Sequence, residues 1–308
     1  MLNGTWHYVR RFLAGAAGRI FLWISSSLAV SVFLYLRHSV ALFQKTWEIV
    51  PGETQIYPVA GIIFTGAFIL FRRGEVWESL EKEAKFSSMP AVRLTGLLLV
   101  VTPALTALLP NMPLEMDISA VILAIVWLGV FTFINPQTSR MLMPYAAIYL
   151  VATLSPRVIY PWAGGPLADF TSLIVGPAAK AVGIPVLQHG RSLEFVSLKG
   201  EMVRFTISPD CSSISSITVF LLLCGLMHLD LKKRVSVTLL FAIIGATVLI
   251  LLNALRVVIL LWVGYVGGDW ALWNVHGWLG YAIMIGFYAL AAKIYMSAGS
   301  RKHVDAKI

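Results

Sequence analysis

Three residues in the last third of the chain have side chains that could do chemistry together: Cys211, Arg256 and His276. A thiolate is a nucleophile, an imidazole can take its proton, and a guanidinium can hold a developing oxyanion. A cysteine protease or transpeptidase needs these three groups. Each residue alone also has a structural explanation, as a packed thiol, a cation reaching the membrane surface, or an interfacial ring. The hypothesis therefore depends on whether the fold brings the three to one place.

Composition places the chain among membrane proteins, because 58% of its residues are apolar, 13% are charged and its mean hydropathy is +0.80. We expect an all-α polytopic fold of about eight transmembrane helices, forming a single integral membrane domain over residues 1–308. Several apolar runs are shorter than the roughly 20 residues that span a bilayer core of about 30 Å, so their helices must include flanking residues. The runs are residues 20–36, 56–71, 94–109, 118–134, 141–154, 214–229, 235–262 and 275–295.

The basic residues of the connecting segments predict the orientation, since Lys and Arg in short loops stay cytoplasmic. With eight spans, all of the basic segments fall on one side. We therefore expect a cell inner or plasma membrane protein with both termini cytoplasmic and residues 155–210 at the outer face. The dispersal of the charges accounts for the net charge of +9 and gives no reason to expect nucleic acid as a partner. The basic residues are Arg10, Arg11, Arg19, Arg72, Arg73, Lys82, Lys85, Arg93, Lys232, Lys233, Arg234, Arg301, Lys302 and Lys307.

The outer segment, residues 155–210, is where something other than a membrane helix is expected. It begins with closely spaced prolines and glycines, and residues 167–182 then show near-helical spacing that Pro177 should kink or divide. We expect short helical pieces lying on the membrane surface. Residues 193–198 and 201–207 are strand-like runs separated by Lys199 and Gly200, which predicts a β-hairpin over residues 193–207 with a two-residue turn.

The predicted hairpin leads directly to Cys211, at the start of the catalytic-motif helices of residues 211–296. Asp210 follows a proline and is a good helix N-cap, which would make Cys211 the first residue of span six. The partial positive charge of a helix N-terminus favours a thiolate, whereas an ionised Asp210 opposes it. Cys224 lies among leucines on the same span and is read as packing. The two thiols are about 20 Å apart along one helix, so no disulfide joins them.

Arg256 interrupts the apolar residues 249–262, where a charge near the membrane centre costs about 2.5 kcal/mol or more. Snorkelling toward the outer interface near Trp262 is one explanation. Asn253 lies three residues earlier on the same helix face and forms with Arg256 a polar stripe that favours a position inside the bundle. We expect Asn253 to orient Arg256.

His276 follows an interfacial aromatic stretch, residues 269–274, and is expected to open the final span at its outer end. The topology, derived from other residues, brings Cys211, Arg256 and His276 to the same leaflet. We find neither a glycine-rich phosphate loop nor a His, Cys and carboxylate spacing typical of metal ligands, so no metal or nucleotide cofactor is expected.

The order of Cys211-Ser212-Ser213, Asn253-Ala254-Leu255-Arg256 and His276 resembles the exosortase/archaeosortase family. The motifs that carry the resemblance lie within residues 184–295. It implies a membrane cysteine protease or transpeptidase that acts on exported proteins bearing a C-terminal sorting signal: a short motif, a transmembrane helix and a basic tail. Cys211 would be the nucleophile and Arg256 and His276 would complete the triad, with Asn253, Asp210 and Ser212 in support. This family commonly has glycine two residues after the cysteine, where this chain has Ser213.

Two other classes of function remain open at this point. In a transporter or channel, Asn253 and Arg256 would line an anion pathway and Cys211 would be incidental. An assembly scaffold for envelope polysaccharide would have no chemistry of its own and would tolerate replacement of Cys211 by serine. The sequence shows neither repeated halves nor paired broken helices, which are typical of transporters.

Overall fold

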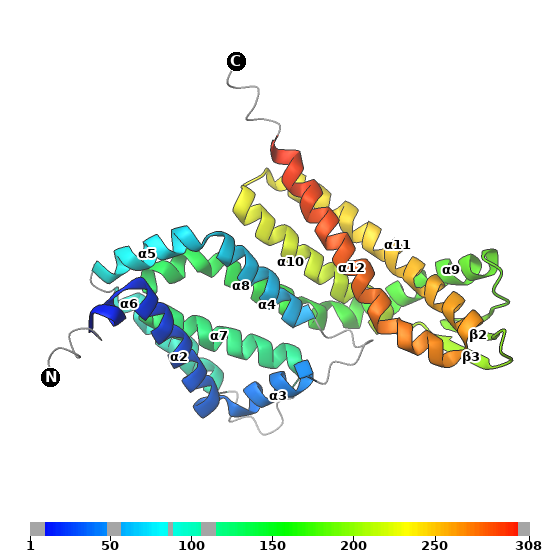
Figure 1. Cartoon of the computed structure of the whole chain (residues 1–308), viewed down its shortest axis with the longest axis horizontal. Coiled ribbons are helices and arrows are strands. Elements are labelled where there is room, and N and C mark those ends of the chain that lie inside the picture. The colour runs from blue at the N-terminus through cyan, green and yellow to red at the C-terminus, as the bar shows by residue number, and fades with distance from the viewer. Residues whose placement is uncertain (1–9, 48–56, 86–88, 106–114, 301–308) are drawn as a thin grey trace, which may run out of the picture. The chain divides into compact units, whose positions relative to one another are not determined.

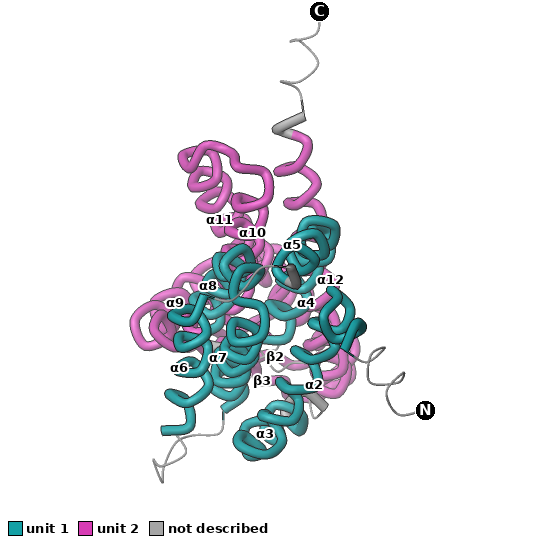
Figure 2. The backbone as a smooth tube through the Cα atoms, turned by 90° about the vertical axis from the view of Figure 1, so that its left-hand side faces the viewer, with its two compact units in different colours: residues 1–48, 58–153 teal, residues 49–57, 154–308 magenta. Residues whose placement is uncertain are grey.

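The computed structural model of the chain describes residues 10–47, 57–85, 89–105 and 115–300 (Figure 1). The predicted cytoplasmic tail from residue 301 onward and the ends of two apolar runs, Ile56 and residues 106–109, lie outside these ranges. The chain divides into two compact units (Figure 2). Unit 1 comprises residues 1–48 and 58–153, and unit 2 comprises residues 49–57 and 154–308.

The described part of unit 1 is helical, and its helices α6 (Pro90–Ala104) and α7 (Met116–Ile134) pack closely. Glycines at the crossing allow this approach: a Cβ on Gly96 would lie 2.6 Å from the backbone nitrogen of Phe133 and 2.8 Å from the carbonyl oxygen of Gly129. Small residues at such a crossing are typical of membrane helices, which gain stability by close packing. The helices are α2 (Ala16–Leu34), α3 (Leu36–Trp47), α4 (Tyr57–Phe71), α5 (Arg73–Lys85), α6 (Pro90–Ala104), α7 (Met116–Ile134) and the start of α8 (Pro136–Ile159).

The predicted fold class is confirmed, since each of the eight predicted apolar runs falls on a helix. Within the described residues, six helical segments are long and apolar enough to cross a membrane: Ala16–Leu34, Met116–Ile134, Pro136–Ala181, Ile214–Leu231, Val235–Gly267 and Asp269–Ser297. Tyr57–Phe71 and Pro90–Ala104 are shorter apolar helices. The chain is a multi-pass membrane protein with a small sheet.

Unit 2 begins with one continuous helical run. The helical spacing predicted for residues 167–182 is confirmed by α9, but the division into short pieces was wrong. α8 continues to Ile159, a π-helical turn follows (η3, Tyr160–Gly164), and α9 (Gly165–Ala181) completes the run. Proline within a helical run removes one backbone hydrogen bond, and a π turn accommodates this irregularity. Pro161 and Pro166 lie at the starts of η3 and α9, while Pro177 lies inside α9.

The predicted hairpin is confirmed, with one strand more and a longer turn than expected. The antiparallel strands β1 (Leu187–His189), β2 (Ser192–Val196) and β3 (Met202–Thr206) form a sheet in the order β1-β2-β3. The N–H of Ser197 donates to the carbonyl of Glu201 at 2.8 Å, which leaves three residues in the turn rather than two. The third, Gly200, has φ +82°, the left-handed conformation that a three-residue hairpin turn requires.

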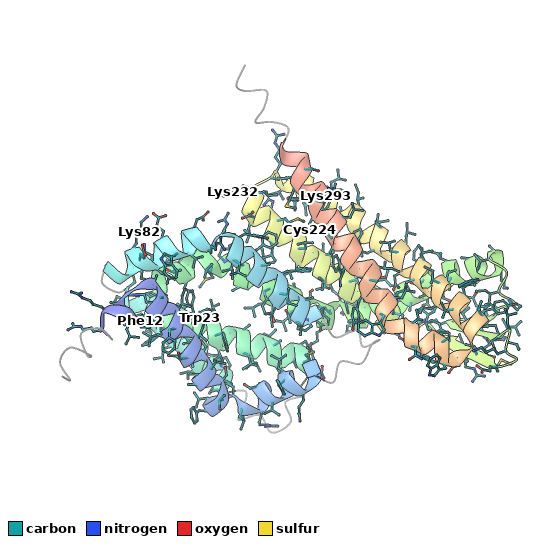
Figure 3. All side chains as sticks on the ribbon, in the orientation of Figure 1. Phe12, Trp23, Lys82, Cys224, Lys232 and Lys293 are labelled. Atoms are coloured by element: carbon teal, nitrogen blue, oxygen red, sulfur yellow. The ribbon has the colours of Figure 1, made fainter. Side chains whose placement is uncertain are left out.

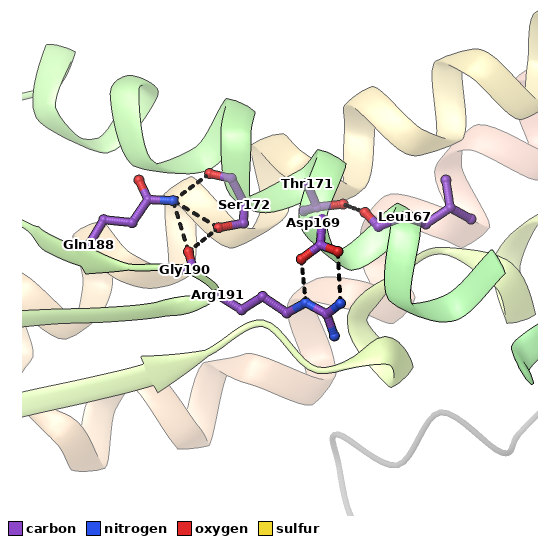
Figure 4. A network of polar contacts seen from close by, with 7 residues as sticks. All are labelled: Leu167, Asp169, Thr171, Ser172, Gln188, Gly190 and Arg191. Carbon is purple, nitrogen blue, oxygen red and sulfur yellow. Dashed lines mark hydrogen bonds and ion pairs between the residues drawn. The ribbon is translucent and has the colours of Figure 1, made fainter. Parts of the chain in front are cut away.

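The turn between β1 and β2 is fastened to α9 by polar contacts (Figure 4). Arg191 donates from Nε and Nη2 to the two carboxylate oxygens of Asp169, at 2.6 and 2.8 Å. This ion pair raises the pKa of Arg191. Gln188 donates from Nε2 to the hydroxyl of Ser172 at 2.8 Å. These contacts hold the sheet against α9.

The inward face of the sheet forms the core of unit 2 with α9, α11 (Val235–Gly267) and α12 (Asp269–Ser300), while α10 (Ile214–Leu231) completes the helices of the unit (Figure 1). Alternate strand residues point inward, as the period of two in a pleated strand requires. β3 then leads into a short 3-10 turn (η4, Pro209–Cys211). The buried residues of this core include Val175, Ala179, Leu193, Phe195, Val203, Phe205, Ile207, Val257, Leu261 and Leu272.

Candidate active site

Cys211 lies at the end of the 3-10 turn and not, as predicted, at the first position of span six. Its N–H donates to the carbonyl of Ser208 at 2.9 Å, which closes a tight turn before the helix. α10 begins only at Ile214, and its N-cap is Ser213, which makes no side-chain cap. The prediction of Asp210 as N-cap was therefore wrong. Its side chain lies outside the described part of the structure.

Ser213 has φ +68° and ψ −1°, the left-handed conformation. This is the position at which the exosortase resemblance calls for glycine, which adopts such a conformation without steric cost. For a residue with a Cβ the conformation costs on the order of 1–3 kcal/mol. Ser213 thus differs from the family pattern in its side chain only. Its backbone has the conformation that suits glycine, and the chain turns sharply between Cys211 and α10.

Asn253 connects the backbone at Cys211 with Arg256. Its Nδ2 donates to the carbonyl of Cys211 at 2.5 Å, and its Oδ1 accepts from Nη1 of Arg256 at 3.4 Å. Both side chains on α11 are buried, with exposed fractions of 2% for Asn253 and 9% for Arg256. The polar stripe points into the unit, as expected, and the burial of Arg256 argues against snorkelling.

Arg256 reaches His276 on α12. Its Nη2 donates to the His276 carbonyl at 3.2 Å and lies 3.3 Å from Nε2 of the ring. A guanidinium carries donors only, so this contact is a hydrogen bond when Nε2 holds a lone pair and the proton sits on Nδ1. Asn253 and Arg256 thus link the backbone of Cys211 to His276 in one polar cluster.

The helix that carries His276 begins earlier than predicted. α12 starts at Asp269, which places His276 about two turns inside the helix. Its ring is buried, at 5.3 Å from the ring centroid of Trp273 and 6.0 Å from that of Phe205 in β3. α12 can begin before the predicted position because an acidic residue is favourable in the first turn of a helix and tryptophans are compatible with a helix at the membrane interface.

Gly280 was not predicted, yet it makes room for the guanidinium. A Cβ at Gly280 would lie 3.1 Å from Cζ and Nε of Arg256 and 3.4 Å from Nη2. The sequence held a signal for this residue, because Gly280 is one helical turn beyond His276 and therefore on the same face of α12. Ser208 was also missed: its hydroxyl donates to Sγ of Cys211 at 3.7 Å.

Four buried groups of this cluster have no hydrogen-bond partner among the described residues: Nε of Arg256, Nδ1 of His276 and the hydroxyls of Ser212 and Ser213. A buried polar group without a partner costs about 1–3 kcal/mol. All four can donate a hydrogen bond, given a proton on Nδ1. The cluster therefore suits a ligand rich in acceptors, such as a carbonyl oxygen or an oxyanion.

The two cysteines differ as the sequence suggested. Both are free; Cys211 is partly exposed, whereas Cys224 is buried in the middle of α10, where Figure 3 labels it. No group of three or more His, Cys, Asp or Glu residues within the described ranges could hold a metal ion. The arrangement instead offers a thiol, an imidazole and a guanidinium.

A family model described as transmembrane exosortase (Exosortase_EpsH) matches residues 51–292, which is most of the chain and contains the whole cluster. No curated protein and no solved structure matches the chain. The chain belongs to the transmembrane exosortase family.

Proposed function

We propose that this exosortase is a cysteine transpeptidase or protease that cleaves the C-terminal sorting signals of exported proteins at the outer face of a cell membrane. The substrate would carry a short motif, an apolar helix and a basic tail. Both termini of the enzyme would be cytoplasmic. Family membership supports the general activity, and the positive-inside pattern of the basic loops supports the orientation.

One observation carries the proposal: a continuous set of polar contacts runs from the backbone of Cys211 through Asn253 and Arg256 to His276. A buried arginine in a membrane helix needs compensation. In this cluster its hydrogen bonds go to an amide, a backbone carbonyl and an imidazole, and its Nε keeps an unpaired donor. A guanidinium with spare donors, held near a thiol, is suited to stabilise negative charge that develops during a reaction.

The proposed reaction begins when the Cys211 thiol loses its proton to the imidazole of His276, which acts as the base. Sγ then forms a bond to the scissile carbonyl carbon, and the carbonyl oxygen becomes an oxyanion facing Arg256. Collapse of this intermediate breaks the C–N bond, and the imidazolium returns its proton to the leaving amine. Water or an acceptor amine next gives a proton to His276 and forms a bond to the thioester carbonyl carbon. The C–S bond then breaks, and the departing Cys211 thiolate takes the proton back from the imidazolium.

A processing assay tests the nucleophile. Cells would express an epitope-tagged exported reporter that ends in a short motif, an apolar helix and a basic tail taken from a protein of the same genome. We expect Cys211→Ala and Cys211→Ser to leave the reporter at full length, because a serine hydroxyl is much less acidic than a thiol. His276→Ala should fail as well.

Cys224→Ala is the matched control, because it removes the second thiol from a buried packing position. It should process the reporter normally at equal protein level. Processing by Cys211→Ala at the wild-type rate would reject the proposed nucleophile and favour the transporter or scaffold explanation.

A further inference from the structure

We propose that the open edge of β3 binds the substrate as an added strand, so that an extended stretch of the sorting signal next to the scissile bond pairs with Met202, Arg204 and Thr206. The inference rests on the proposed function and specifies how the same site would hold its substrate.

In the register of the sheet, the backbone N–H and C=O groups of these three residues form no hydrogen bonds with β2. The strand order places β3 at one edge, with β2 as its neighbour. Ile207 donates its N–H to the carbonyl of Arg191 at 3.0 Å, which marks the residues of odd number in β3 as those that bond to β2. The N–H and C=O groups of Met202, Arg204 and Thr206 therefore point away from β2. No described residue bonds to them.

The chemistry of this edge selects an extended peptide. N–H and C=O groups that alternate at strand spacing match the backbone of another strand, whereas a helix has already paired its own groups. Five residues of β3 extend over about 17 Å, which accommodates a motif of about five residues. Peptide binding to a sheet edge takes its affinity from main-chain bonds and its selectivity from the alternate side chains.

The position of the edge connects it with the reaction. β3 ends at Thr206, and the chain continues through Ser208 to Cys211. Phe205, inside the same strand, packs against the ring of His276. A peptide aligned on β3 would thus end at the thiol, beside the buried donors that lack acceptors. Peptide carbonyls are acceptors of the kind that these donors require.

Two surface features fit this use of the edge. Arg204 is exposed and pairs with Glu194 of β2 at 2.6 Å on the outward face. A charge at the middle of a short edge strand disfavours pairing with the same strand of another copy of the protein. The edge therefore stays available to the substrate. Trp273 is half exposed and lies 6.1 Å from the ring of Phe205, where it offers an aromatic surface to a substrate side chain.

Two substitutions at Arg204 distinguish the contribution of its backbone N–H to substrate binding from that of its side chain. Arg204→Pro removes an N–H that points away from β2, and proline is tolerated at such an edge position. Arg204→Ala removes the charge but keeps the N–H. We expect Arg204→Pro to lower reporter processing by about tenfold, as loss of a main-chain bond and strand contact implies, and Arg204→Ala to stay within about twofold of wild type.

Protein level and maleimide labelling of Cys211 in each variant report whether the site still folds. With both unchanged, equal processing by Arg204→Pro and Arg204→Ala, whether normal or lost, would overturn backbone pairing. The comparison is made after wild type and Cys211→Ala have been shown to differ on the same reporter, which separates this test from that of the proposed function.

A crosslinking experiment measures binding without catalysis. A photoreactive amino acid would replace Thr206 on the β3 edge or Leu187 on β1, the opposite edge strand, in a Cys211→Ala chain co-expressed with the tagged reporter. Both positions are exposed, which makes Leu187 the matched control. We expect reporter crosslinks from position 206 at several times the yield from position 187. Equal yields, or none from position 206 with a reporter that wild type processes, would refute the proposal.

Discussion

Substitution of Gly280 by alanine should lower activity without lowering stability. Gly280 lies on the α12 face that contacts Arg256, and an added Cβ would stand 3.1 Å from Cζ and Nε of the guanidinium. Ordinary contacts of this kind begin near 3.4 Å, so the guanidinium must move by about 0.3 Å or α12 must shift. The hydrogen bond from Nη2 to the His276 carbonyl is already 3.2 Å long, and such a movement takes it to the limit of a useful bond.

The expected loss follows from the role proposed for Arg256. Removal of an oxyanion donor typically costs about 10²–10³ in rate, and a misplacement of about 1 Å costs about 10². A shift of a few tenths of an ångström should therefore cost about tenfold in reporter processing. The folding stability should increase while the activity falls, because alanine stabilises a helix interior relative to glycine by about 0.5–1 kcal/mol.

The assay compares initial rates of reporter cleavage in membranes that contain equal amounts of each variant. Gly286→Ala is the control, since it makes the same change on the same helix at a site where a Cβ meets nothing within 4 Å. It should cleave at the wild-type rate. Thermal unfolding of the detergent-solubilised proteins should show no loss of stability in either variant.

Two results would refute this reasoning. If Gly280→Ala cleaves as fast as Gly286→Ala, the position of the guanidinium is not important for the rate. If Gly280→Ala loses activity and stability together, the glycine serves helix packing and says nothing about Arg256.

Three further predictions concern neighbouring residues. Arg256→Lys should lose most reporter processing at equal protein level, because an ammonium cannot reproduce the planar, forked donor; near-normal processing would remove the oxyanion role. Ser213→Gly should raise the unfolding temperature slightly, whereas Ser213→Val should lower protein level, since a β-branched residue fits the left-handed conformation poorly; the reverse order in a thermal-unfolding assay would contradict the strain argument. A membrane-impermeant maleimide should label Cys211 but not Cys224 in intact cells, and labelling of Cys211 only after the inner face is opened would reverse the proposed orientation.

The apolar helices could be predicted because burial in a bilayer requires long apolar runs, which hydropathy detects directly. The continuous helical run through η3 could not be predicted, since Pro161 and Pro166 are ordinary signals for a turn. A π turn at residues 160–164 lets the run continue through them. Alternation revealed β2 and β3, but β1 has only three residues and depends on pairing with β2, so no local pattern marks it.

The sequence could predict that the candidate site residues lie near one another, but it could not predict their geometry. Cys211, Arg256 and His276 could be grouped because topology alone assigns them to one end of the membrane helices. The tight turn at Cys211 could not be foreseen, since the Pro209-Asp210 pair is equally compatible with a helix start. The place of Gly280 beside Arg256 depends on how α11 and α12 pack, which the sequence of either helix does not encode by itself.

The exceptions to ordinary folding rules gather in the same few residues. Ser213 holds a left-handed backbone without being glycine, and the hydroxyls of Ser212 and Ser213, Nδ1 of His276 and Nε of Arg256 are buried without partners. Each exception opposes folding, so the apolar core of unit 2 must offset them together. If these groups served packing alone, apolar replacements of similar shape would be more stable and equally functional. In the reaction that we propose, a peptide carbonyl under attack at the partly exposed thiol would supply the acceptors that these donors lack.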